Sequence, residues 1–410
     1  MSSILRNRRV RVVALAAAAI AVALPASAGA QGAVQGKKGP AGTAFYNPPR
    51  KLIKGTPGTV IWQREIKYTA SGRVALPEAG KTILVLYRSR DPKGKPIAVS
   101  GTVDVPKGAA PSGGWKMVSW AHGTTGVADI CAPSRTKAGG PADGYIQYAS
   151  ATADGWLKAG YAVLRTDYEG LGVSGPHRYL IGESEGRSVV DIALAARNLF
   201  PSGTMSDEYD IGGHSQGGHA ALFAASMAAK DAPSLKLKGI FAYAPASHIY
   251  EQRVAIPSLD ISFSGLSGLA LTILDSAARE AGVSTKSLVS PKVAKLLGVL
   301  EKGCSPDVSK ALIKIAPKDI LKPGVKSDKV DAVLKAMNPA VSIPVPVLIL
   351  QGSSDTTVFP NFTTTLVSEL QAKGNNVTFQ QFDGLTHSTV VTDKSPQDAV
   401  LVFLRSTLGS

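Results

Sequence analysis

The 410-residue chain is predicted to have an α/β fold, with a mostly parallel sheet, helices on both faces and an inserted helical cap. Two observations predict it. From about residue 116 onward, apolar strand-like runs alternate with helical patterns, which is typical of βαβ units. Over residues 246–338 that alternation gives way to consecutive helical patterns, most of them containing lysines.

The first residues have the composition of an export signal. Arginines precede an apolar run, Val12–Leu24, and small residues follow at 26–28. This pattern predicts a signal peptide over residues 1–28, with cleavage after Ala28 or, as the second choice, after Ala30. A membrane anchor is the alternative, but the apolar run is short for a span, and no later segment is expected to cross a bilayer. The expected location is therefore extracellular, with the periplasm as the other option.

The composition is that of a globular protein with a basic surface. Hydrophobic residues make up 44% of the chain and charged residues 18%, and the formal net charge is +15. Such a charge is compatible with nucleic-acid binding, but the lysines are scattered and match no nucleic-acid motif. We therefore expect no nucleic-acid partner, and a solvated surface that anionic lipid or cell-wall material would attract peripherally. The sequence does not indicate whether the protein is a monomer or an oligomer.

The chain has two cysteines, Cys131 and Cys304. In an exported protein such a pair most simply forms one disulfide bond, and two buried free thiols are the alternative. Neither cysteine has a second cysteine or a histidine at ligand spacing, so no metal site is expected.

The core is predicted in two parts, residues 59–245 and 339–410, preceded by a loose N-terminal arm over residues 29–58 that is rich in Gly, Pro and Lys. The first part opens with the alternating runs "TVIWQREIKYT", "TILVLYRS" and "IAVSGTVDVP", which predict an antiparallel edge. In the second part, "PVPVLILQGSSD" and "NVTFQQFDG" are predicted strands on either side of a helix.

One stretch, "YDIGGHSQGGHAALFAASMA", surrounds Ser215 with glycines. The G-x-S-x-G pattern within it is short enough to arise by chance. A strand before it and a helix after it are the context of a nucleophile elbow, whose sharp turn lifts the serine oxygen above the sheet. Glycines are favoured there because side chains would collide with the neighbouring strand and helix. Ser215 is the predicted nucleophile, and a plain glycine-rich turn is the alternative.

A serine hydroxyl needs a base, and the base needs a carboxylate partner. In α/β-hydrolases the serine comes first along the chain, then Asp or Glu, then His. Of the six histidines only His387 lies beyond the last predicted strand, and Asp355 directly follows a buried strand. We therefore predict His387 as the base and Asp355 as its partner. Asp383 is the alternative carboxylate, and His214, next to the serine, is expected to point elsewhere.

The segment "WAHGTTG" follows the strand that begins near residue 116, where esterases supply a backbone N–H to the oxyanion hole. We assign this donor to Thr124, with Gly123 as the alternative. The second donor is expected from Gln216, the residue after the serine. His122 is expected to anchor the loop without taking part in proton transfer.

Six segments carry a family resemblance: "AHGTTG", "TDYEGLG", "PHRYLIGESEGRSVVD", "GHSQGG", "GSSD" and "LTH". With them the sequence resembles the secretory lipase family of α/β-hydrolases from about Lys67 onward. The resemblance implies a carboxylic-ester hydrolase with a helical cap over an acyl pocket. It implies a lipid or small-molecule ester as substrate, an acyl-enzyme intermediate and no cofactor.

Two other functions remain open from the residues. A serine peptidase can use the same fold and the same three residue types. An exopeptidase would need an acidic clamp for the substrate amine, and the cap has no obvious acidic cluster. A non-catalytic binding protein with a vestigial site is the second alternative, and the presence of all three residue types in the expected order argues against it.

Overall fold

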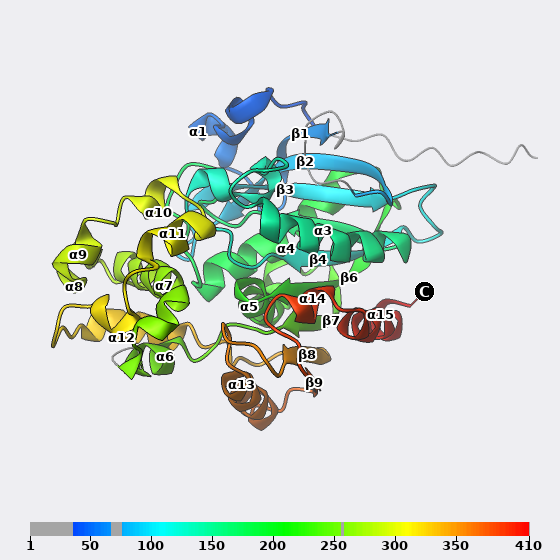
Figure 1. Cartoon of the computed structure of the whole chain (residues 1–410). Coiled ribbons are helices and arrows are strands. Elements are labelled where there is room, and N and C mark those ends of the chain that lie inside the picture. Colours follow the sequence, from blue (N-terminus) through cyan, green and yellow to red (C-terminus); the bar gives the residue numbers. More distant parts are fainter. Residues whose placement is uncertain (1–35, 67–75, 256–257, 410) are drawn as a thin grey trace, which may run out of the picture.

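The computed structural model describes residues 36–66, 76–255 and 258–409 (Figure 1). The predicted signal peptide, and the beginning of the predicted N-terminal arm, lie outside the described residues.

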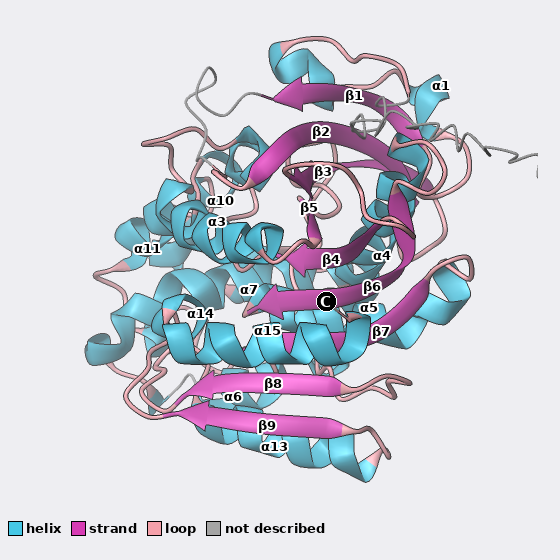
Figure 2. Cartoon of the chain, turned by 90° about the vertical axis from the view of Figure 1, so that its right-hand side faces the viewer, coloured by secondary structure: helices cyan, strands magenta, loops and turns pink. Residues whose placement is uncertain are grey.

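Among the described residues, one mixed nine-stranded sheet has the strand order β1-β2-β3-β5-β4-β6-β7-β8-β9. Pairing is antiparallel from β1 through β3 to β5, and every neighbour from β5 to β9 is parallel (Figure 2). This confirms the predicted antiparallel edge on a mostly parallel sheet. The strands are β1 (Val60–Ile66), β2 (Ala79–Arg90), β3 (Pro96–Pro106), β4 (Trp115–Ala121), β5 (Ala162–Thr166), β6 (Met205–His214), β7 (Lys236–Tyr243), β8 (Val347–Gly352) and β9 (Val377–Phe382).

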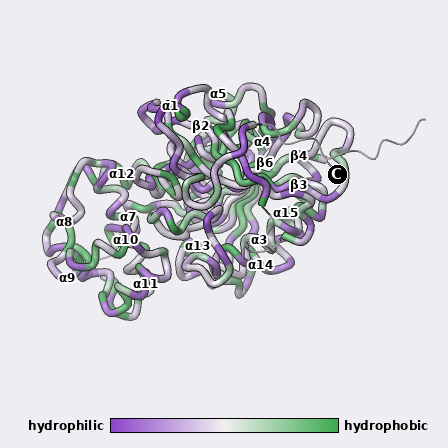
Figure 3. Tube along the Cα trace, turned by 90° about the horizontal axis from the view of Figure 1, so that it is seen from above, coloured by the Kyte–Doolittle hydropathy of each residue, from purple (hydrophilic) through white to green (hydrophobic). Residues whose placement is uncertain are grey.

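Helices cover both faces of this sheet, as predicted. On one face, α4, α5 and α13 bury alanines and branched aliphatic residues against the strands, and on the other face α3, α14 and α15 do the same around Trp120 and Trp156. Figure 3 shows the hydrophobic segments, in green, along the strands between these layers. The covering helices are α3 (Asp143–Lys158), α4 (Gly182–Leu199), α5 (Gln216–Asp231), α13 (Pro360–Ala372), α14 (Thr389–Thr392) and α15 (Lys394–Leu408).

Short helices fill the chain between β7 and β8 and gather at one end of the sheet (Figure 1). They bury an apolar cluster of their own, which includes Leu271, Leu312 and Val330. We propose that residues 246–338 form a cap, and use that name for them below. Its elements are α6 (Ile249–Ala255), η5 (Ile261–Leu266), α7 (Ser267–Glu280), α8 (Thr285–Leu288), α9 (Pro291–Ala294), α10 (Val299–Lys302), α11 (Ser305–Leu312), η6 (Pro317–Asp319) and α12 (Asp328–Ala336).

One cap segment is longer and more apolar than the sequence analysis expected. Ile261–Glu280 has 20 residues and is long and apolar enough for a membrane span by length and composition alone. Half of its most apolar window is buried inside the protein, and Leu271 and Leu274 of α7 belong to the apolar cluster of the cap. The apolar residues of α7 therefore help to fill the interior of the cap, whereas Ile261 and Phe263 of η5 are exposed.

The N-terminal segment corrects an expectation, because its described part is not a loose arm. Two short helices, η1 (Gly42–Tyr46) and α1 (Arg50–Ile53), precede β1. Phe45 is fully buried, and its carbonyl oxygen accepts a 2.9 Å hydrogen bond from the indole N–H of Trp62. Aromatic burial, which the Gly, Pro and Lys content of the segment concealed, ties it to the antiparallel edge.

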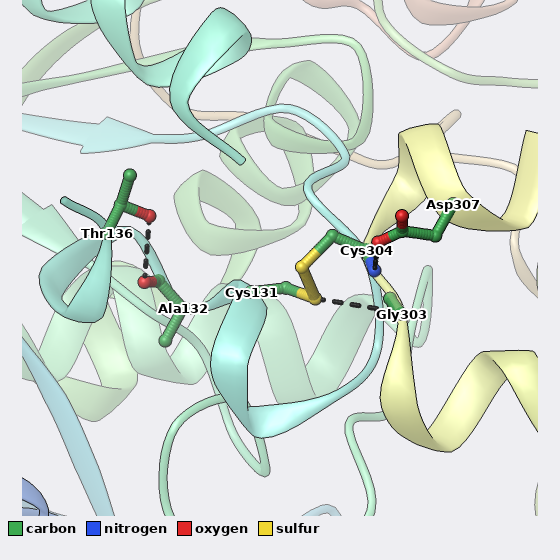
Figure 4. The surroundings of a disulfide bond; sticks show 6 residues. All are labelled: Cys131, Ala132, Thr136, Gly303, Cys304 and Asp307. Carbon is green, nitrogen blue, oxygen red and sulfur yellow. Dashed lines mark hydrogen bonds between the residues drawn. A yellow bond between two sulfur atoms is a disulfide. The ribbon is translucent and has the colours of Figure 1, made fainter. Parts of the chain in front are cut away.

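The predicted disulfide bond is present. Cys131, in the short turn η2 (Asp129–Cys131), is bonded to Cys304, directly before α11, with 5.4 Å between their Cα atoms (Figure 4). Beside it the Ser305 N–H donates a 2.9 Å hydrogen bond to the carbonyl of Thr125. The loop after β4 is therefore fastened to the cap by both a covalent bond and a backbone contact.

Candidate functional site

Ser215 lies in a strained turn between β6 and α5. Its backbone angles are φ 58° and ψ −117°, in a region that residues with a side chain rarely adopt. A Cβ on Gly217 would lie 1.9 Å from the carbonyl oxygen of Ala121, and one on Gly213 would lie 2.0 Å from the carbonyl oxygen of Gly217. The glycines around the serine are thus required by backbone contacts, and the turn has the geometry of a nucleophile elbow.

His387 and Asp355 come together from the loops that follow β9 and β8. The His387 Nδ1 lies 2.7 Å from the Asp355 Oδ2, and the carboxylate side chain is fully buried. Asp355 also accepts hydrogen bonds from the backbone N–H groups of Thr357 and Val358, at 2.8 and 2.9 Å. These donors fix the carboxylate, which in turn orients the imidazole and leaves its Nε2 as an acceptor.

The alternative carboxylate, Asp383, is exposed in the turn after β9. Among the hydrogen bonds and ion pairs of the described residues, His387 meets Asp355 and not Asp383.

Ser215 and His387 line one cavity of about 170 Å³, which we call the serine cavity. The core contributes Thr124, Tyr145, Tyr148 and His214 to its wall, and the cap contributes Leu269, Val308 and Ser309 among others. Ser215 is only 8% exposed, and residues of both the core and the cap surround the cavity beside it.

The loop after β4 places Thr124, one of the two predicted oxyanion donors, beside this cavity. The Gly123 N–H already donates to the hydroxyl of Tyr145, which removes Gly123 as a free donor. The Thr124 N–H has no partner among the hydrogen bonds of the described residues, and the Thr124 hydroxyl lies 2.6 Å from that of Tyr179. Gln216 opens α5, where backbone N–H groups have no acceptor within the helix. This pattern favours Thr124 over Gly123.

We expected His214 to point away from the site, but in the structure it lies beside His387. Its ring lies 4.5 Å from the ring of His387, and its Nε2 lies 2.9 Å from the carbonyl oxygen of His387. Sequence reasoning missed this because it placed His214 by its neighbour along the chain, whereas the contact comes from a loop 173 residues later.

Side chains behind the elbow form a buried polar cluster. The Glu185 carboxylate accepts from the Gln216 amide at 2.7 Å and lies 3.2 Å from the His219 Nδ1. The His219 Nε2 in turn lies 3.0 Å from the carbonyl oxygen of Met337, at the end of the cap. Glu185, from the "GESEGRS" segment, therefore anchors the residue that carries the second predicted oxyanion donor.

The "DYEGLG" segment is architectural. Asp167 accepts from the backbone N–H of Ser134 at 2.8 Å and from the hydroxyl of Ser100 at 2.6 Å. The Tyr168 hydroxyl donates to the carbonyl of His122 at 2.8 Å. Burial lowers the pKa of His122 to about 4, which keeps its ring neutral and agrees with an anchoring role in the loop.

A second cavity, of about 130 Å³, lies between the cap and the beginning of α13 and has a mostly apolar lining. We call it the cap cavity. Leu269 and Thr357 line both the cap cavity and the serine cavity, so the two adjoin. Further lining comes from Leu266, Ile273, Leu274, Ile320, Phe359 and Phe362. Among the described residues no group of three or more His, Cys, Asp or Glu side chains is arranged to hold a metal ion.

Comparison with known proteins adds a family match. The model of the family described as secretory lipase matches residues 143–405. A protein of Mycobacterium tuberculosis named "Probable inactive lipase MT1628" is 30% identical over 221 residues, which are 51% of this chain and 46% of that protein. The chain thus spans about half the length of the curated relatives it matches.

Solved structures share the fold. The closed state of Candida antarctica lipase A has a TM-score of 0.67 at 20% identity, over 84% of this chain and 80% of that one. The rice cell wall degrading esterase LipA from Xanthomonas oryzae has the same TM-score at 18% identity, over 86% of this chain and 99% of that one. Both likenesses support an α/β-hydrolase fold for this chain.

Proposed function

Because the chain belongs to the secretory lipase family, we propose that it is a secreted serine hydrolase of carboxylic esters that acts through Ser215, His387 and Asp355. The observation that carries the proposal is the 2.7 Å contact between His387 and Asp355 at the cavity that Ser215 also lines. That arrangement pairs a nucleophile on a strained elbow with an imidazole held in one tautomer.

In the proposed acylation step the Ser215 Oγ attacks the carbonyl carbon of the ester as its proton passes to the His387 Nε2. Asp355 stabilises the resulting imidazolium through the Nδ1–H. The N–H groups of Thr124 and Gln216 donate to the oxyanion of the tetrahedral intermediate. The intermediate collapses when His387 gives the proton to the departing alcohol, which leaves Ser215 esterified with the acyl group.

In the proposed deacylation step water replaces the alcohol. His387 takes a proton from the water, the hydroxide oxygen adds to the acyl carbonyl, and the second intermediate passes through the same oxyanion contacts. Collapse of that intermediate returns the proton to the Ser215 Oγ and releases the carboxylic acid. No metal or organic cofactor is required.

The cap cavity supports a lipid ester as substrate. An acyl chain attached at Ser215 can extend past Leu269 and Thr357 into this apolar space, where each buried methylene contributes about 0.8 kcal/mol. A peptide substrate would need buried polar partners there, and the lining is predominantly aliphatic and aromatic. Hydrolysis of p-nitrophenyl esters of increasing acyl length, compared with aminoacyl anilides, separates the esterase from the peptidase.

Ser215→Ala tests the assignment. We expect kcat for a p-nitrophenyl ester to fall by about 10⁴-fold or more, because the nucleophile is lost, with an unchanged circular dichroism spectrum. Ser226→Ala, an exposed serine on the same helix, is the control and is expected to keep full activity. Substantial esterase activity in purified Ser215→Ala would contradict the proposal.

One relative raises the alternative of a non-catalytic protein, since its name is "Probable inactive lipase MT1628". A fluorophosphonate probe distinguishes the two, because it reacts with activated serines. We expect stoichiometric labelling of this chain at Ser215 and none in Ser215→Ala. An unlabelled unmodified protein would favour the non-catalytic function.

Secretion is supported by the family and by the Cys131–Cys304 disulfide bond, which persists in oxidising compartments. N-terminal sequencing of the exported protein is expected to give a chain that starts at Gly29.

A further inference from the structure

We propose that His214 is a positioning residue, whose ring holds the backbone of His387 so that the His387 imidazole stays directed toward Ser215. This inference rests on the proposed function of Ser215 and His387. The His214 Nε2 lies 2.9 Å from the His387 carbonyl oxygen, and the two rings lie 4.5 Å apart. Since a carbonyl accepts only, the His214 Nε2 carries the proton and donates it.

A second contact fixes the same tautomer. The Tyr145 hydroxyl accepts from the Gly123 N–H, so its own proton is free to point at the His214 Nδ1, 3.4 Å away. The Tyr145 and His214 rings are also stacked, with an interplanar angle of 8°. The hydrogen bonds therefore run in one direction from Gly123 through Tyr145 and His214 to His387, and they connect the proposed oxyanion loop with the loop of the proposed base.

Two hydrogen bonds hold His387, the proposed base, in position. Asp355 holds the side chain of His387 at Nδ1, and His214 holds its backbone at the carbonyl oxygen. Loss of the His214 contact removes the hydrogen bond that the carbonyl oxygen of His387 accepts, and with it one restraint on the position of the Nε2. A displacement of about 1 Å at a reacting group can cost about 100-fold in rate.

Burial keeps the His214 ring suited to this role. His214 is almost fully buried, and burial together with the neighbouring His387 lowers the pKa of His214 well below its usual value. A neutral ring donates its hydrogen bond without placing a second positive charge beside the imidazolium that His387 becomes during the reaction.

Two substitutions at His214 separate hydrogen bonding from packing. His214→Gln keeps a donor and an acceptor on one side chain, whereas His214→Phe keeps a ring of similar size but has neither. We expect His214→Phe to lower kcat at least tenfold with KM within about twofold, because a ring of similar size preserves the part of the cavity wall that His214 forms. His214→Gln is expected to recover kcat to within about threefold of the unmodified protein.

Control variants account for effects on folding. His248→Phe makes the same change at another buried histidine, whose ring nitrogens lie near Ser247 and Glu369 and whose ring stacks on Phe362, and is expected to leave kcat unchanged. All variants are compared by thermal unfolding. The inference is wrong if folded His214→Phe keeps full kcat, or if His214→Gln is as slow as His214→Phe.

A spectroscopic measurement keeps this test separate from the test of the proposed function. The proton between the His387 Nδ1 and Asp355 gives a low-field NMR signal that requires no substrate. We expect its exchange with water to be at least tenfold faster in His214→Phe than in the unmodified protein, and to be nearly normal in His214→Gln. Equal exchange rates in all three proteins would overturn the inference, even if the chain hydrolysed no ester.

Discussion

The core and the cap are built in different ways. The core carries the proposed reactive residues at the ends of strands. Ser215 and Asp355 follow β6 and β8, which pair with neighbours on both sides, and His387 follows β9, the last strand of the sheet. The cap consists of helices of 3 to 14 residues and contains most of the exposed large hydrophobic residues among those described. These exposed residues in the cap are Val254, Ile261, Phe263 and Ile313.

The difference indicates that the core and the cap contribute to function in different ways. Backbone contacts in the core leave little freedom, since a single added Cβ at Gly217 meets a carbonyl oxygen. In the cap the side chains are packed into an apolar cluster with many partly buried members. We therefore expect substitutions in the core to affect the chemical step, and those in the cap to affect substrate choice or stability.

The largest expected effect comes from paired substitutions of buried aspartates. Asp355→Asn is expected to lower kcat about 10⁴-fold with the fold intact, because the amide cannot stabilise the His387 imidazolium and favours the wrong tautomer. Asp275→Asn, in cap helix α7, removes a carboxylate that binds Thr285 and Arg279, and is expected to lower thermal stability while leaving kcat near normal. Steady-state kinetics measures kcat and thermal unfolding measures the stability of both variants. Equal kcat values in the two variants would contradict the expected difference between core and cap.

Paired glycine substitutions come next. Gly217→Ala is expected to destabilise the protein by about 3 kcal/mol and to abolish activity, because its Cβ would lie 1.9 Å from the Ala121 carbonyl oxygen. Gly265→Ala in the cap meets no atom within 4 Å, and is expected to change stability by less than about 1 kcal/mol. Urea unfolding of the two variants is the measurement. A Gly217→Ala variant as stable as the unmodified protein would contradict this expectation, because it would show that the turn accommodates a Cβ at position 217.

The smallest expected effect concerns pH. Burial raises the pKa of Asp210, on β6 in the core, from 3.8 to about 8. The folded chain then holds a proton that the unfolded chain releases, so the stability due to this group is present below about pH 4 and is lost as the pH rises toward 8. Between pH 6 and pH 8 the free energy of unfolding of the unmodified protein should therefore fall. In Asp210→Asn this fall should be smaller by about 2 kcal/mol.

Urea unfolding at the two pH values checks this expectation, with Asp398→Asn, an exposed carboxylate on α15, as the control. A parallel fall in the unmodified protein and in Asp210→Asn would contradict it. The unmodified chain also contains Asp191, whose pKa burial raises to about 7, so part of the pH dependence is expected to persist in Asp210→Asn.

The sequence was informative where the backbone limits which residues fit. The glycines on either side of Ser215 are needed for close contacts, and so they predicted a sharp turn between a strand and a helix. The disulfide bond followed from the presence of two cysteines in a chain predicted to be exported. The catalytic roles of Asp355 and His387 remain predictions, although the structure brings the two side chains into contact.

Other features could not be found from the sequence. Helix α3, Asp143–Lys158, was not predicted, because its many small and polar residues weaken the helical periodicity that marks a buried face. The contact of Tyr145 with His214 depends on this helix and was missed with it. The buried Phe45 was missed because composition describes a segment on average and does not indicate which single residue packs.

The Cys131–Cys304 bond closes a covalent ring of the chain that contains Ser215 but neither Asp355 nor His387. A protease that cuts once between positions 131 and 304 leaves two fragments that still migrate together in electrophoresis until a reductant is added. The bond does not bridge a cut between positions 304 and 355, so denaturing electrophoresis separates a C-terminal fragment that contains both Asp355 and His387. Gels run with and without reductant therefore reveal whether a cut lies inside or outside the ring that the disulfide bond closes.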